Sequence, residues 1–102
     1  MTARDIDILS IISNAGPSGI TLDAVARHLV NMHTTLFEQP DFQVAHRLVQ
    51  RMLKQMEAEE PPVVAKQSTG RFLLTERGRL LLRQYIRDLF AEEGAEATAY
   101  GI

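Results

Sequence analysis

The sequence predicts one domain of the α+β class. A length of 102 residues suggests a single folding unit. Apolar residues recur with helical spacing in several segments, and two short strand-like runs, 63–66 and 71–74, flank a polar stretch of turn-forming residues. An apolar share of 45 % is ordinary for a soluble globular protein and allows a compact core.

The first third of the chain predicts two helices joined by a turn. Residues 3–14 are apolar nearly all round, which indicates a central, buried helix capped by Thr2, and Asp5 suits its first turn. Turn-forming residues at 14–19 end this helix, Ile20 resembles a short strand, and Thr21 is the expected cap of the second helix. One face of that helix carries Leu22, Val25, Ala26 and Leu29.

A looser stretch and the most regular helix of the chain follow. We expect residues 31–40 to fold back on the core through Leu36 and Phe37. Asp41 is the predicted cap of the third helix, and Pro61-Pro62 ends it. Its apolar positions at i, i+3, i+4 and i+7 are Ala45, Leu48, Val49, Met52, Leu53 and Met56. Met32, Met52 and Met56 are expected to fill the core.

Residues 70–82, GRFLLTERGRLLL, predict a strand that runs into the last helix. The runs 63–66 and 71–74 form a hairpin with its tip at 67–70, and Thr75 caps the helix that follows. Gly78 lies in the first helical turn, where glycine costs about 1 kcal/mol relative to alanine. Either another backbone passes too close for a Cβ at this position, or the glycine is merely tolerated near a helix start. We expect this helix to fade near Glu93, so that residues 1–93 form the domain and 94–102 a flexible tail.

This order of elements resembles the winged helix-turn-helix domain. Residues 8–29, ILSIISNAGPSGITLDAVARHL, are similar to the first two helices of bacterial winged-helix regulators. Residues 72–82, FLLTERGRLLL, are similar to the aromatic-x-Leu-Thr-x-x-Gly-x-x-Leu-Leu signature of MarR-type and PadR-type proteins. The resemblance covers about residues 6–89 and implies a three-helix core, a two-stranded hairpin as the wing, and a C-terminal helix. The connection of about nine residues before the third helix departs from the three or four of a tight helix-turn-helix.

Positive charge is concentrated in the middle of an acidic chain. The formal net charge is −2, yet residues 43–87 hold nine Lys or Arg and four Glu, a balance of +5. Residues 1–42 carry −3 and residues 88–102 carry −4. Local potential, and not total charge, releases counterions from a phosphate backbone, so this distribution is compatible with a nucleic-acid partner.

The third helix and the hairpin supply the candidate DNA-binding residues. On the third helix these are Gln43, His46, Arg47, Gln50, Arg51 and Lys54, opposite the apolar face. Gln and Arg suit base edges and Lys suits phosphate, although an ordinary solvated face has a similar composition. Lys66 and Arg71 flank the hairpin tip and would touch phosphate or the minor groove, or else protect an exposed strand edge from pairing.

The last helix carries an apolar face beside a row of arginines. Leu82, Tyr85, Ile86 and Leu89 are expected to be buried, in part at a two-fold interface between two copies of the chain. The same face has the alternative role of closing the domain's own core. The row of Arg79, Arg83 and Arg87 is either solvated or placed against acidic residues of a partner.

Other chemistry finds little support in the sequence. Cysteine is absent, which excludes disulfides and thiolate sites, and His28, His33 and His46 lack a metal-ligand spacing. We find no phosphate loop and no nucleophile–base pair, so we expect neither an enzyme nor a cofactor nor a metal. The first residues lack the pattern of a signal peptide and no apolar run approaches a membrane span, so we expect a cytoplasmic protein without a membrane partner.

These observations predict a winged-helix domain that binds double-stranded DNA as a homodimer and acts as a small transcriptional regulator. The alternative is a winged-helix adaptor that binds a protein partner and no DNA.

Overall fold

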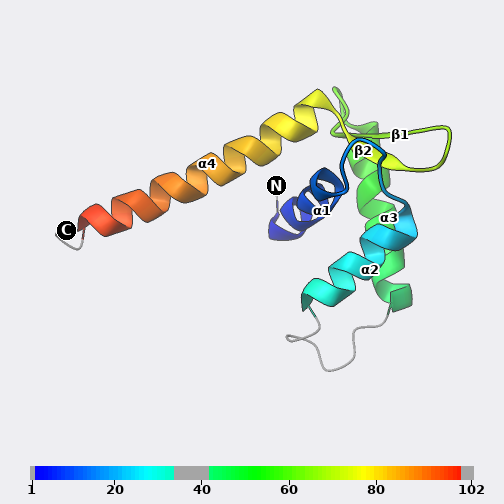
Figure 1. The fold of residues 1–102 in the computed structure, drawn as a ribbon, viewed down its shortest axis with the longest axis horizontal. Helices are drawn as coiled ribbons and strands as arrows, with labels where there is room; N and C mark the ends of the chain where they lie inside the picture. The colour runs from blue at the N-terminus through cyan, green and yellow to red at the C-terminus, as the bar shows by residue number, and fades with distance from the viewer. Residues whose placement is uncertain (1, 34–41, 100–102) are drawn as a thin grey trace.

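A computed structural model of the chain describes residues 2–33 and 42–99 (Figure 1). The elements follow in the order α1 (Ala3–Asn14), α2 (Leu22–His33), α3 (Phe42–Ala58), β1 (Val64–Lys66), β2 (Phe72–Leu74) and α4 (Glu76–Ala99). The predicted α+β class is confirmed. The expectations for Leu36, Phe37 and Asp41 lie outside the described residues.

Threonine side chains cap three of the helices, as the sequence predicts. Thr2 forms a capping box with Asp5: the Asp5 amide donates to the Thr2 hydroxyl over 3.2 Å, and the Thr2 amide donates to the Asp5 carboxylate over 2.8 Å. Thr21 accepts from the Ala24 amide at 3.3 Å. Thr75 accepts from the Gly78 amide at 3.1 Å. The starts of α1, α2 and α4 are thus set by local hydrogen bonds.

Helix α1 lies at the centre of the core. It buries five residues around its circumference, and α2, α3, the hairpin and the start of α4 complete the packing. The buried hydrophobic side chains are Ile6, Ile8, Leu9, Ile11, Ile12, Ile20, Val25, Ala26, Leu29, Val49, Met52, Leu53, Met56, Val63, Val64, Phe72, Leu74 and Leu82. Met52 and Met56 fill the core as expected, but Met32 is 48 % exposed. Met32 lies in the last turn of α2, where the other described elements cover it only in part.

The predicted hairpin is confirmed. Strands β1 and β2 are antiparallel, with Ala65 opposite Leu73, and residues 67–70 form the tip. Ile20 forms an isolated antiparallel bridge to Phe72: its amide donates to the Phe72 carbonyl at 3.1 Å and its carbonyl accepts from the Phe72 amide at 2.7 Å. The turn between α1 and α2 is therefore bound to the hairpin.

Helix α4 leaves the body of the protein after its first turns (Figure 1). Only Leu82 of the four residues expected to be buried is so, whereas Tyr85, Ile86 and Leu89 are 41–45 % exposed. This part of the face therefore does not close the domain's own core, because the helix projects beyond the described elements that would cover it. Burial at a two-fold interface stays a prediction. The helix also runs on to Ala99 and does not fade near Glu93. None of the described helices combines the length and apolar character that a membrane span requires.

Gly78 lies directly against the backbone of Val63. The Val63 carbonyl accepts from the Thr75 amide at 3.1 Å and from the Thr75 hydroxyl at 2.9 Å, which holds it over the first turn of α4. A Cβ on residue 78 would overlap this carbonyl oxygen and come within 3.4 Å of Leu74. Of the two explanations for this glycine, the close approach of another backbone is confirmed.

We predict that Gly78→Ala destabilises the protein, although alanine favours helices by about 1 kcal/mol. The added methyl must displace a hydrogen-bonded backbone, and such overpacking costs about 1–3 kcal/mol. Urea unfolding followed by circular dichroism should show a lower midpoint. The control Gln84→Ala, at an exposed position on α4, should leave the midpoint unchanged. An increase in stability for Gly78→Ala would contradict the close approach.

Candidate nucleic-acid interface

The outer face of α3 is a solvent-facing surface of polar and basic residues. The opposite face of the helix packs into the core through Val49, Met52, Leu53 and Met56. At 100° per residue, burial of that face leaves the other side of the helix exposed. We call this side the α3 outer face, and its predicted members, all exposed, are Gln43, Arg47, Gln50, Arg51 and Lys54. Five of the six candidates on this helix therefore lie as the sequence predicts.

His46 is the exception, because its ring faces α2. Its Nε2 lies 2.7 Å from the Asp23 carboxylate, and its side chain is only 30 % exposed. The ring also lies against Phe42, with 5.9 Å between the ring centroids. Asp23 lies in the first turn of α2, so the contact joins the starts of two helices. The prediction that His46 belongs to the exposed face is wrong, because its position on the helix lies between the outer face and the core.

Arg27 and Phe42 complete this contact between α2 and α3. The Arg27 guanidinium carbon is 5.8 Å from the centre of the Phe42 ring, which is a cation–π geometry. Phe42 itself is 36 % exposed. The sequence pattern did not single out Arg27 or Phe42, since their contact is between helices separated by residues 34–41. Together with the His46–Asp23 pair they hold the beginning of α3 in place.

Lys66 is the last residue of β1 and Arg71 directly precedes β2, so they flank the hairpin tip, and both are exposed. The Lys66 ammonium is 5.9 Å from the centre of the Phe72 ring. Arg71 donates from Nη1 to the Gly19 carbonyl at 3.4 Å, so part of its guanidinium supports the turn before α2. The Lys66 ammonium is therefore more available to an external partner than the Arg71 guanidinium. The hairpin and α3 lie at the end of the molecule opposite the projecting end of α4 (Figure 1).

Val44 is an exposed apolar residue on the α3 outer face that the sequence analysis passed over. Its side chain is 60 % exposed. It precedes Arg47 by three positions and Arg51 by seven, so the three side chains follow one row of the helix. In the sequence Val44 lies at the edge of the apolar spacing, four positions before the partly buried Leu48.

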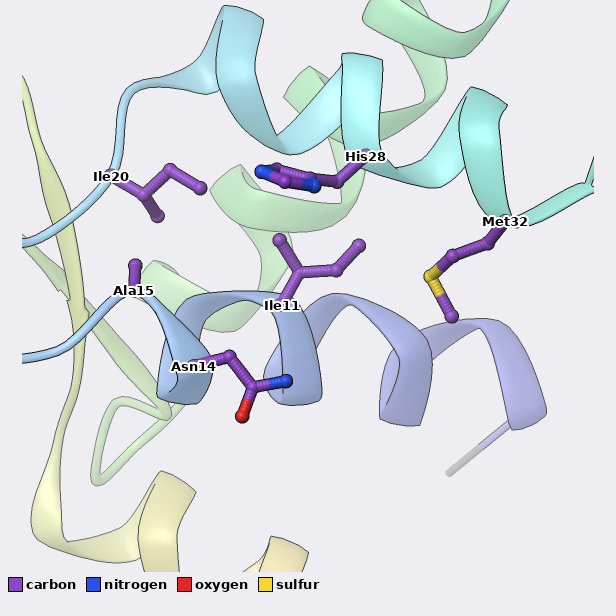
Figure 2. A pocket seen from close by; sticks show the side chains of 6 residues that line it. All are labelled: Ile11, Asn14, Ala15, Ile20, His28 and Met32. Carbon is purple, nitrogen blue, oxygen red and sulfur yellow. The ribbon is translucent and has the colours of Figure 1, made fainter.

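A groove of about 360 Å³ runs between α1 and α2 (Figure 2). It is lined by Ile11, Asn14, Ala15, Ile20, His28 and Met32. His28 is the only ionisable group in this lining, so the groove holds no acid–base pair. The described residues contain no group of three or more His, Asp or Glu side chains that could hold a metal ion. This groove thus offers an apolar surface and no catalytic constellation.

Helix α4 also exposes an apolar face, separate from the groove between α1 and α2. Tyr85, Ile86, Leu89 and Phe90 are between 41 % and 66 % exposed and follow helical spacing from the buried Leu82. Arg79, Arg83 and Arg87 are exposed on the adjoining side of the helix. The face is continuous with the core at Leu82, but no described residue of the chain covers it. Four exposed apolar side chains thus share one side of the helix and are not scattered over the surface.

We predict that His46 and Asp23 are coupled in stability. A double-mutant cycle with His46→Ala and Asp23→Ala should give a coupling energy below about 1 kcal/mol, as expected of a partly exposed pair. The cycle removes the separate effect of Asp23 on the α2 dipole. The same cycle with Gln50→Ala in place of His46→Ala should give no coupling, because Gln50 is uncharged and exposed on the α3 outer face. Equal values for both cycles would contradict a specific contact.

Comparison of the chain with protein-family models, with curated proteins and with solved structures found no match. The functional argument therefore rests on the geometry of the α3 outer face, the hairpin and α4.

Proposed function

We propose that this protein binds double-stranded DNA as a winged-helix domain and acts as a small transcriptional regulator. The observation that carries the proposal is the α3 outer face, where Arg47, Gln50, Arg51 and Lys54 are all exposed on one helix. An α-helix fits the major groove of B-DNA, and Arg and Gln form paired hydrogen bonds with base edges there. Lys54, further along the same face, suits a phosphate.

The hairpin supports the proposal as the wing of such a domain. Lys66 and Arg71 place two exposed positive charges on either side of its tip. The pairing of Ile20 with Phe72 fixes the hairpin to the turn before α2, so that it has a defined position relative to α3. A hairpin held in this way can contact the sugar-phosphate backbone while α3 occupies the groove. The long connection before α3 is the one departure from the family pattern.

Binding experiments can distinguish the role of the α3 outer face from that of the hairpin. Arg47→Ala or Gln50→Ala should relax the sequence preference at a cost of about 1–3 kcal/mol each, because a bidentate base contact is lost. Lys66→Ala should weaken binding to all duplexes alike and reduce the salt slope by about 1. Arg71→Ala is the less clean test, since it also removes the bond to Gly19. Titration against a random duplex pool at two salt concentrations measures both effects.

The control is Arg4→Ala, which removes an exposed charge of α1 outside α3 and the hairpin. It should preserve the sequence preference. Equal and negligible binding by the wild-type protein and Arg47→Ala, even at low salt, would end the DNA proposal.

The apolar face of α4 favours self-association. We propose that Tyr85, Ile86 and Leu89 pack at a two-fold interface, because a small domain gains stability by sharing apolar surface and two-fold dimers are the commonest assembly. The row of Arg79, Arg83 and Arg87 would then flank the interface. Two DNA-binding surfaces in one particle also suit a regulator that recognises two half-sites.

We predict that Leu89→Asp converts the dimer to a monomer, because it places a charge in an apolar interface. Light scattering should report about half the mass of the wild-type protein, with unchanged helix content. Leu80→Asp, on the other side of α4, should leave the mass unchanged. A wild-type monomer at high micromolar concentration would reject the dimer and leave the fold intact.

A protein-binding adaptor is the second candidate function, and the same exposed α4 face favours it. An adaptor would use Tyr85, Ile86, Leu89 and Phe90 to bind a different protein, and would bind no duplex. The negative formal net charge is also compatible with this alternative. Duplex binding at low salt that depends on Arg47 would exclude it as the sole function.

A further inference from the structure

Among the residues that the structure describes, Val44 occupies a place on α3 that neither packing nor helix propensity explains. The core contacts of α3 come from the opposite face, and the Val44 side chain is 60 % exposed. A β-branched residue also lowers helix propensity slightly relative to the unbranched residues around it. A short, stiff, apolar side chain therefore stands among polar and basic neighbours that reach further into solvent.

Phe42, the other exposed apolar residue at this end of α3, differs from Val44 in having partners. Its ring lies against His46 and under the Arg27 guanidinium, which orients it toward α2. Phe42 is thus part of the contact that positions α3. Val44 is left as the apolar side chain that the first turns of α3 present outward among the described residues.

We propose that Val44 recognises the C5-methyl group of thymine in the major groove, next to a base pair contacted by Arg47. This inference rests on the proposed DNA binding and names a feature of the sequence that is bound. Thymine is the natural DNA base with a methyl group on the major-groove edge, and an apolar side chain discriminates it by excluding water from that methyl.

The spacing of the two side chains fits neighbouring base pairs. Val44 and Arg47 are separated by three residues, which is about 4.5 Å along the helix axis at 1.5 Å per residue. Successive base pairs are about 3.4 Å apart. A thymine contacted by Val44 should therefore lie within about two base pairs of the guanine whose O6 and N7 accept from Arg47. Arg51, one turn further, extends the same row.

Uracil tests the proposal, because it lacks only the methyl group of thymine. A preferred duplex is first selected from a random pool with the full-length wild-type protein. Each thymine is then replaced singly by uracil, and affinities are measured by titration. We expect about three- to fourfold weaker binding at one position, because the uracil duplex loses the burial of one methyl group. We expect 5-methylcytosine to be preferred over cytosine at that position for the same reason.

Variants assign the discrimination to Val44. Val44→Ser removes both methyl groups while its helix propensity stays similar, so it should bind the thymine and uracil duplexes equally. Val44→Thr retains one methyl group and should retain part of the preference. The matched control Leu80→Ser removes an apolar side chain that is 53 % exposed on α4, and it should discriminate like the wild-type protein.

The outcomes separate this inference from the proposed function. Duplex binding without any thymine–uracil difference, or a difference that survives in Val44→Ser, would overturn the role of Val44 and leave DNA binding in place. No duplex binding by the wild-type protein would overturn both. Loss of the difference in Val44→Ser with wild-type circular dichroism would support the assignment.

Discussion

The backbone carbonyl of Val63 determines how α4 packs against the hairpin and the end of α3. It accepts hydrogen bonds from both the amide and the hydroxyl of Thr75, and it fills the space where Gly78 has no side chain. The Val63 amide in turn donates to the Met56 carbonyl at 2.9 Å, near the end of α3. One residue thus links the end of α3, the beginning of the hairpin and the first turn of α4. Arg77 adds a further hydrogen bond from α4 to the carbonyl of Pro61.

The linked elements give the protein two separate surfaces. Helix α3 lies with the hairpin at one end of the molecule, and α4 projects toward the other (Figure 1). The first carries the polar and basic outer face, and the second carries the exposed apolar face. Two surfaces of such different chemistry suit different partners. A nucleic acid requires positive charge and hydrogen-bond donors, whereas a protein interface requires apolar area that excludes water. The proposed regulator uses both surfaces, and the proposed adaptor uses only the second.

Local sequence signals predicted the elements well. Thr2, Thr21 and Thr75 cap helices because a threonine hydroxyl reaches an amide two or three residues away, and this requires no knowledge of the fold. The hairpin followed from alternation around a polar tip, whereas the cost of Gly78 in a helix left two explanations open. These arguments depend on neighbours in the chain.

The errors concern contacts between distant segments. A helical projection placed His46 beside the outer face but could not show that Asp23 of α2 stands opposite its ring. Met32 belongs to an apolar helix face, yet the other described elements cover it only in part. The apolar pattern of α4 predicted which side of the helix is apolar, but the direction in which the helix leaves the body decides whether the same chain covers that side. Hydrophobic periodicity predicts which face of a helix or strand is apolar, but not which other element packs against that face.

The close packing at the first turn of α4 also has a geometric consequence for its far end. Gly78 is the third residue of a 24-residue helix, and a helix rises about 1.5 Å per residue, so Ala99 lies about 32 Å beyond it. A tilt of about 10° at Gly78 would displace that end by roughly 5 to 6 Å, more than the diameter of a methyl group. A small shift at the pivot therefore suffices to misalign any surface that meets α4 near its tip. A substitution at residue 78 would then affect assembly by changing the direction of α4, and not by removing contacts at its far end.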